Sequence, residues 1–272
     1  MRICVSHETV YRYDIPPSGV MQVLRLTPRN YTGQYVVNWR IDVSTDCRLE
    51  PLEDAFGNIT HAFSASGPIS ELRLLANGEV ETQDTAGVVR GAVERFLPSL
   101  FLRETALTRA DDAILAYAAQ FGRPATLSVL HDLLIRAHDD LDFDAELVTT
   151  NAVAAETFAA KRGTCQDLAH VFIAVARALG VPARYVSGYL HRPDAVAAAD
   201  GAHAWAEAHV PDLGWVGFDP ASGLCVTDRY IRVAIGLDSL GAVWVRGAHY
   251  GGGREEAVVK LRVTQASWQT QG

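Results

Sequence analysis

The sequence contains three residue types that could together perform acyl transfer: a cysteine, then a histidine, then an aspartate. Cys165 follows Gly163 and Thr164 and precedes an apolar run with helical spacing, so we expect it in the first turn of a mostly buried helix. Unpaired N–H groups and the positive end of the helix dipole favour an anion at that position. A thiol so placed ionises more readily than most thiols. We therefore predict a thiolate nucleophile at Cys165.

A cysteine nucleophile needs a histidine to move protons, and the histidine needs an acceptor to hold its ring. Residues 202–210 alternate like a strand with one apolar face, and His203 stands at its entrance after a flexible loop over 191–201. His209 is six residues further along, about 20 Å away at roughly 3.3 Å per residue. Only one of the two histidines can therefore lie near the thiol, and we assign the role of base to His203.

Asp219 ends the next strand, 215–218, which a hairpin-like connection joins to the strand of His203. Pairing the two strands places Asp219 opposite Trp205 or Ala206, a diagonal step from His203. This register permits a hydrogen bond that would hold the histidine ring. The alternative is that Asp219 serves only a turn, where aspartate is common.

The elements that must position these residues form two groups. Residues 1–85 are rich in β-branched and aromatic residues separated by turn signals, which predicts an N-terminal antiparallel β-sandwich-like domain. In residues 86–272, segments with helical period precede segments with strand period. We predict an α+β core there, with helices packed on an antiparallel sheet and with the C-terminal strands included.

Composition limits the class of partner. The chain has 272 residues, 49% of them hydrophobic, which suffices for a sizeable core. A formal charge of −8 and the absence of basic clusters exclude a nucleic-acid groove. No stretch approaches the roughly 20 apolar residues of a membrane helix, and the first residues lack the apolar segment of a signal peptide. We expect a cytoplasmic protein that binds neither nucleic acid nor membrane.

The four cysteines, Cys4, Cys47, Cys165 and Cys225, are widely scattered and contain no C-x-x-C pair. They indicate neither a zinc site nor a disulfide framework. We expect no metal and no other cofactor. A zinc hydrolase is a distant alternative, since a cysteine, a histidine and an aspartate are all possible ligands.

Three blocks of the sequence resemble the bacterial transglutaminase-like family, which belongs to the papain-like superfamily of cysteine nucleophiles. The family's cysteine, histidine and aspartate fall on Cys165, His203 and Asp219. The N-terminal stretch resembles the β-rich region often attached to this core. The three blocks are Arg-Gly-Thr-Cys-Gln-Asp-Leu-Ala at 162–169, Gly-Ala-His-Ala-Trp-Ala-Glu at 201–207 and Gly-Trp-Val-Gly-Phe-Asp-Pro at 214–220.

The resemblance implies a papain/transglutaminase-like core that attacks amides through a thioester acyl-enzyme. Two departures bear on the outcome. Gln166 stands where the animal cross-linking enzymes carry a tryptophan, and Ala159 stands where papain-type proteases carry an oxyanion-stabilising glutamine. The oxyanion hole thus has the Cys165 backbone N–H and an unidentified second donor. By position, Gln166 could donate to the oxyanion, and Tyr189 could line the cleft.

We therefore predict an enzyme that cleaves amide bonds in a peptide or protein substrate. Water is the expected acyl acceptor, because nothing in the sequence marks a site for an amine. Two alternatives stay open: transglutaminase-type transfer to an amine, and a non-catalytic binding or scaffold protein that keeps only the fold.

Overall fold

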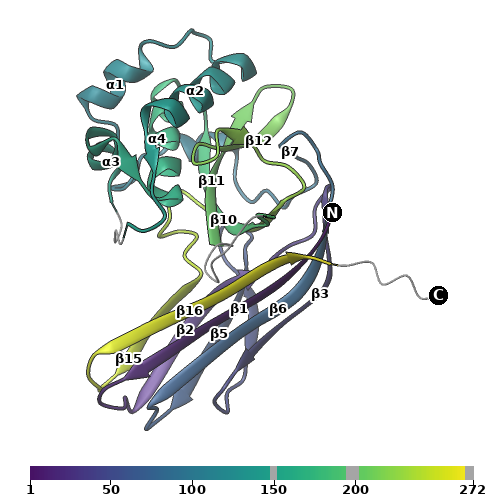
Figure 1. Cartoon of the computed structure of the whole chain (residues 1–272), viewed down its shortest axis with the longest axis vertical. Helices are drawn as coiled ribbons and strands as arrows, with labels where there is room; N and C mark the ends of the chain where they lie inside the picture. The colour runs from purple at the N-terminus through teal and green to yellow at the C-terminus, as the bar shows by residue number, and fades with distance from the viewer. Residues whose placement is uncertain (148–151, 194–201, 267–272) are drawn as a thin grey trace, which may run out of the picture.

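The computed structural model describes residues 1–147, 152–193 and 202–266. Figure 1 shows a long β-sandwich at one end of the molecule and, at the other, helices that pack on a separate β-sheet. Within the described ranges no helix is both long and apolar enough to cross a lipid bilayer. The architecture confirms the α+β class predicted from the sequence.

The β-sandwich consists of two four-stranded antiparallel sheets, with strand orders β16-β1-β6-β3 and β15-β2-β5-β4. Nearly every second residue of β1 and β2 is buried, as expected for strands with one face on a core. Leu24, Leu72 and Leu74 lie in that core between the sheets. The strands are β1 (Arg2–Tyr13), β2 (Gly19–Thr27), β3 (Gln34–Val43), β4 (Glu50–Glu53), β5 (Ile59–Ser66), β6 (Glu71–Thr82), β15 (Val245–Tyr250) and β16 (Glu255–Gln265).

The C-terminal strands belong to this sandwich and not to the core in which the sequence placed them. β16 pairs with β1 from Ile3↔Gln265 to Tyr13↔Glu255, and β15 pairs with β2. The strand period in the sequence predicts that these segments are strands, but it carries no information about their partners. The pairing covers edges of β1 and β2 that would otherwise leave backbone groups unpaired.

The core contains a six-stranded antiparallel sheet in which β13-β12-β11-β10-β14 is the main order and β7 pairs with β12. β10 and β11 are buried along almost their whole length. The strands are β7 (Val88–Val89), β10 (Ala183–Leu190), β11 (Ala202–Val210), β12 (Gly214–Asp219), β13 (Leu224–Cys225) and β14 (Tyr230–Gly236). β11 presents its small residues, Ala204, Ala206 and Ala208, to the helices.

The helices pack around one central member, α4 (Cys165–Ala178). Its neighbours are α1 (Asp112–Ala118), α2 (Leu127–Asp140) and α3 (Ala154–Ala160), together with β10 and β11. The short elements of this part are the 3-10 helix Pro98–Leu102 and the parallel pair β8 (Asp142–Phe143) and β9 (Arg162–Gly163). The helices precede β10 to β14 in the chain, as the sequence predicted.

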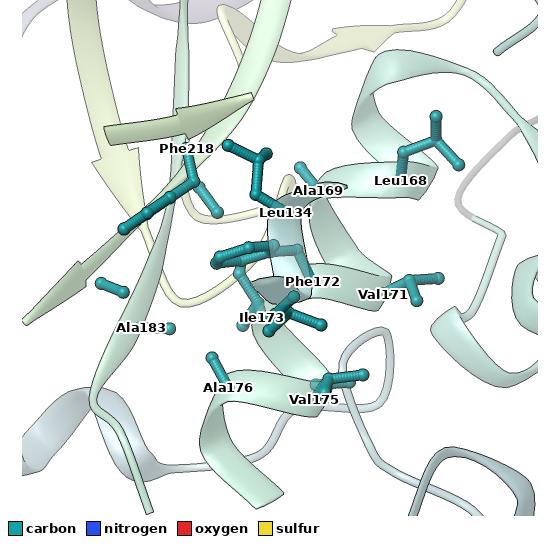
Figure 2. Close-up of a cluster of buried hydrophobic side chains, with 14 of the residues drawn as sticks. Leu134, Leu168, Ala169, Val171, Phe172, Ile173, Val175, Ala176, Ala183 and Phe218 are labelled. Atoms are coloured by element: carbon teal, nitrogen blue, oxygen red, sulfur yellow. The ribbon is translucent and has the colours of Figure 1, made fainter. Parts of the chain in front are cut away.

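Burial of every residue from Asp167 to Arg177 fixes the position of α4. Figure 2 shows its apolar side chains directed towards neighbouring elements, among them Leu134 of α2 and Phe218 of β12. The rings of Phe172 and Phe218 stack with centroids 5.2 Å apart. Burial of a side chain of this size stabilises a fold by about 1.5–3 kcal/mol. The first turn of α4 is therefore held by the packing of the whole helix.

Candidate active site

The first turn of α4 places Cys165 at the first helical position. Thr164 is the N-cap, and it forms a capping box with Asp167. The Thr164 N–H and hydroxyl both donate to Asp167 Oδ2, over 2.9 and 2.7 Å. Asp167 is thus a capping residue as well as an acid at the positive end of the helix dipole. These contacts fix where the Cys165 backbone, and hence its thiol, can lie.

Gly163 is required by the close approach of the chain to this turn. A Cβ at Gly163 would lie 2.8 Å from Asp167 Cβ and 2.9 Å from Thr157 Cγ2, closer than real carbon atoms approach. Any larger residue would push the N-cap away from α3. The glycine before the cysteine therefore has a packing role.

His203 and Asp219 are brought together by the pairing of β11 with β12. Ala206 pairs with Phe218, so Asp219 lies one step further towards His203, as the predicted register requires. His203 Nε2–H donates to Asp219 Oδ2 over 2.7 Å, and both side chains are almost completely buried. The predicted contact is present. The loop expected before His203 falls largely outside the described residues.

Asp219 has further donors that sequence reasoning missed. Ser222 Oγ and Tyr230 OH donate to Asp219 Oδ2 over 2.5 and 2.7 Å, and the backbone N–H of Ala221 donates to Oδ1 over 3.0 Å. Ser222 and Ala221 lie in the turn after Asp219, where such bonds are common. Tyr230 comes from β14, so only the strand order could have shown it.

The electrostatics of this group favour a charged pair. Burial alone would lower the pKa of His203, but the Asp219 carboxylate and the charge of Cys165 outweigh burial and raise that pKa to about 10. Burial would raise the pKa of Asp219, but His203, Ser222 and Tyr230 together lower it. Because Nε2 is bonded to Asp219, Nδ1 is the ring nitrogen left for the thiol. The arrangement therefore favours the protonated form of His203.

Cys165 and His203 line one cleft of about 480 Å³. Gln166, the neighbour of Cys165, is exposed and lines the same cleft, so it lies where the sequence predicted; its role as an oxyanion donor stays a prediction. Tyr185, which the sequence analysis did not select, is also a lining residue. Its ring lies 5.3 Å from that of His170.

The prediction that Tyr189 lines the cleft is wrong. Its side chain is fully buried, and its hydroxyl lies 3.1 Å from Nδ1 of His7. The ring packs against Trp244 with centroids 5.0 Å apart. Tyr189 therefore lies behind the cleft wall, packed on His7 and Trp244, which line the cleft themselves.

The geometry gives no support to the zinc alternative. In the part of the chain that the structure describes, no group of three or more His, Cys, Asp and Glu side chains is arranged to hold a metal ion. Cys165, His203 and Asp219 do not converge on one point, because the imidazole ring is bonded to Asp219 on one side and faces the thiol on the other.

The chemistry of this arrangement is that of a cysteine nucleophile with a histidine held by a carboxylate, and two family models match the chain accordingly. Residues 116–220 match the transglutaminase-like superfamily, and residues 3–81 match the bacterial transglutaminase-like N-terminal region. The first match includes all three residues of the site. The chain belongs to the transglutaminase-like superfamily, with the bacterial transglutaminase-like N-terminal region before its core.

The chain is similar along nearly its whole length to uncharacterized mycobacterial proteins. It is 30% identical to one from Mycobacterium tuberculosis, over 96% of this chain and 91% of that protein. It is 29% identical to one from Mycobacterium leprae, over 97% of this chain and 99% of that protein. The whole two-part architecture is therefore shared with these relatives.

A solved structure supports the fold. The crystal structure of a putative cysteine protease from Cytophaga hutchinsonii superposes with a TM-score of 0.77 at 18% identity. The match covers 100% of this chain and 92% of that chain, so the sandwich and the core are both included. At this identity the likeness concerns the fold.

Proposed function

We propose that this protein is a cysteine-nucleophile hydrolase that cleaves amide bonds in peptide or protein substrates. Cys165 is the nucleophile, His203 the general acid and base, and Asp219 the residue that orients His203. The observation that carries this proposal is the 2.7 Å hydrogen bond from His203 to Asp219 in the cleft that also holds Cys165 at the start of α4.

The reaction follows from these positions. The Cys165 thiolate attacks the amide carbonyl carbon, and a carbon–sulfur bond forms. As the carbon–nitrogen bond breaks, protonated His203 gives its proton to the leaving amine, which departs and leaves a thioester. A water molecule then attacks the thioester and gives a proton to His203. The carbon–sulfur bond breaks, the carboxylic acid departs, and the thiolate and imidazolium are restored.

The negative oxygen of the tetrahedral intermediates needs hydrogen-bond donors already in place. The backbone N–H of Cys165 lies in the first turn of α4, where N–H groups have no partner within the helix. We assign the second donor to the side-chain amide of Gln166, which lines the cleft beside the nucleophile. This assignment extends the proposal by proximity and by the donor chemistry of the amide.

The lining of the cleft favours water as the acceptor. Among the described residues that line it, none is Asp, Glu, Lys or Arg. A lysine side chain that enters the cleft as the acyl acceptor would carry a positive charge. It would find no carboxylate among these lining residues. Transfer to an amine is therefore the second candidate function, and the assay with an added amine described below distinguishes it from hydrolysis.

Two measurements test the proposal. The first compares the rates at which iodoacetamide alkylates Cys165 and Cys225, by peptide mass spectrometry at pH 7. Cys225 is a matched control because it is also half-buried, but burial raises the pKa of its thiol. The second traps an acyl adduct by intact mass from a library of peptide amides and esters, with Cys165→Ala as the comparison. We expect faster alkylation at Cys165 and an adduct only on the wild type.

The outcomes separate the alternatives. Alkylation of Cys165 no faster than that of Cys225, together with no adduct, would favour a non-catalytic member of the fold. Adding a primary amine to the turnover assay distinguishes the acceptors, since hydrolysis yields the carboxylic acid and transfer yields the amide. A product that is mainly the amide would replace hydrolysis by transglutaminase-type chemistry.

A further inference from the structure

The β-sandwich supplies one wall of the cleft that holds Cys165 and His203. We propose that this wall binds an uncharged, apolar side chain of the substrate next to the scissile amide, so that the sandwich determines substrate specificity. The inference rests on the proposed function and names the class of substrate for that site. It depends on the C-terminal strand β16, which the sequence alone assigned to the other part of the protein.

The wall is built from segments far apart in the chain. Alternate residues of β16, namely Ala257, Val259 and Leu261, line the cleft. Trp244 and Leu240, in the segment that runs from the core sheet to β15, line it as well. The nucleophile and base come from the core, so a substrate bound at Cys165 lies between the two parts of the molecule.

The wall carries no charge in its described part. Its polar members include His7, whose Nδ1 lies 3.1 Å from Tyr189 OH and whose Nε2 lies 3.4 Å from Thr9 Oγ1. Burial lowers the pKa of His7 to about 4, so this ring is neutral at pH 7. A charged substrate side chain would lose its hydration there without gaining a partner of opposite charge. An apolar side chain has no such hydration to lose and therefore binds there without this penalty.

The wall is held in place by contacts to both parts of the protein. The Trp244 ring lies 4.7 Å from that of His7 and 5.0 Å from that of Tyr189. The Trp244 carbonyl accepts from the Arg25 N–H over 2.7 Å, and the Ala242 carbonyl accepts from Ser187 Oγ over 2.8 Å. A wall so fixed presents a preformed surface, which reduces the entropy lost on binding.

The size of the cleft agrees with this use. Its volume of about 480 Å³ lies within the roughly 300–1,000 Å³ of small-molecule and ligand sites. Val259 keeps 48% of its surface exposed, and it is a lining residue. An apolar side chain placed against Val259 would cover surface that is otherwise in water, which stabilises the complex by about 25 cal/mol per Å² buried.

The test uses two neighbouring valines of β16. Val259 lines the cleft, whereas Val258, 38% exposed, is the adjacent residue and points to the other face of the sheet. Val259→Asp places a charge on the wall. Val259→Thr changes the polarity at nearly constant shape, and because threonine is also β-branched, the strand tolerates this substitution. Val258→Asp and Val258→Thr are the matched controls. Fluorogenic peptides carry Phe, Leu, Gly, Glu or Lys on either side of the scissile amide.

For the wild type we expect kcat/KM at least tenfold higher for Phe or Leu than for Glu or Lys, on one of the two sides. Val259→Asp should lower kcat/KM for the apolar peptides about tenfold, and Val259→Thr by a smaller factor. The glycine peptide should change less than threefold. The Val258 variants should match the wild type. The rate of Cys165 alkylation should stay within twofold in all variants, which shows that the nucleophile is intact.

A wild type without preference on either side overturns the inference, and so do equal losses from the Val258 and Val259 variants. Failure of the proposed function is distinct from these results. It would appear as an unreactive Cys165 and no turnover of any peptide. Circular dichroism and the alkylation rate identify a variant that does not fold. If an aspartate variant does not fold, the comparison of Val259→Thr with Val258→Thr tests the inference.

Discussion

His203 Nε2 lies 2.7 Å from Asp219 Oδ2, in a buried site where Tyr230 and Ser222 donate to the same carboxylate oxygen. Three donors on one oxygen keep this carboxylate ionised and fix its position. The ring of His203 is thereby held by one nitrogen, and the other is free to exchange a proton with Cys165. The carboxylate thus controls both the orientation and the charge of His203, the base that we propose.

Replacing the carboxylate should therefore impair catalysis without removing the nucleophile. For Asp219→Asn we expect kcat to fall by about 10²–10⁴-fold, the contribution typical of general acid–base catalysis. The amide offers an N–H where His203 needs an acceptor, so the ring loses both its hold and its preference for the charged form. Steady-state turnover of a peptide amide, with the pH profile of Cys165 alkylation, measures both effects.

Tyr230→Phe is the graded control for that experiment, because it removes one of the donors to Asp219 and leaves the carboxylate. Its activity should lie between those of the wild type and Asp219→Asn. If Asp219→Asn kept wild-type kcat, Asp219 would have no part in orienting His203.

Stability should fall in alkaline solution because of His203. Its pKa of about 10 in the folded protein lies above the ordinary value near 6.5, so the folded state binds this proton more tightly than the unfolded chain. The contribution is complete below pH 6.5 and is lost as pH rises through about 10. Urea unfolding of Cys165→Ala at pH 6.5, 8 and 10 should show a smaller decline than unfolding of the wild type, because one anion that stabilises the imidazolium is absent.

In acid the sign reverses for His170, a buried ring whose Nε2 accepts from the Ser239 N–H over 3.0 Å. Burial lowers the pKa of His170 to about 4, against the opposing charges of Asp238 and Asp167. Stability from this group is present above pH 6.5 and is lost as pH falls towards 4, by up to about 3 kcal/mol at about 1.4 kcal/mol per pKa unit. His170→Gln, which can still accept, should show a shallower loss of unfolding free energy between pH 6.5 and 4.

His7 has the same kind of lowered pKa, so the acid slope should not vanish in His170→Gln. The double variant with His7→Gln should be shallower still. An unchanged slope in both variants would mean that acid unfolding depends on other groups.

The helix cap should affect both stability and reactivity. Thr164→Ala removes the hydroxyl that bonds to Asp167 Oδ2 over 2.7 Å, and loss of an N-cap costs about 0.5–2 kcal/mol. The first turn of α4 carries Cys165, so alkylation of the thiol should slow as well. Thr164→Ser restores the hydroxyl and should restore both quantities. Denaturant unfolding and iodoacetamide kinetics on the same samples make the comparison.

The buried carboxylate of Glu207 should be the most costly single charge to remove. Glu207 accepts from Arg184 Nε over 2.6 Å and from Arg232 Nε over 2.7 Å, and these guanidinium groups together hold its pKa at about 2 against the effect of burial. Glu207→Gln leaves two buried cations without their shared partner, and we expect a loss of about 3–5 kcal/mol in unfolding free energy.

Glu94→Gln is the matched control, since Glu94 also pairs with Arg184 but its side chain is 35% exposed. The loss there should be within about 1 kcal/mol, as for partly solvated ion pairs. Equal losses from the two variants would contradict the view that burial of Glu207 makes its charge important.

The sequence by itself determined the local features of this site. The small residues before Cys165 and the apolar period after it define a helix start, and the alternation of 202–210 with the following hairpin sets the register that brings Asp219 to His203. These are near-neighbour relations, in which helical and strand periods and one short connection set the geometry. They sufficed to predict the contact between His203 and Asp219, and the resemblance to the transglutaminase-like family joined Cys165 to that pair.

Only the tertiary structure decided what surrounds them. β16, near the C-terminus, pairs with β1, near the N-terminus. Tyr230 donates to Asp219 from β14, a strand that no local pattern links to Asp219. Tyr189 packs on Trp244 behind the cleft that Tyr185 lines, which the strand pattern alone did not show. Strand periodicity is the same whichever strand becomes the partner, so sheet order, and with it the wall of the cleft, follows from how the elements pack.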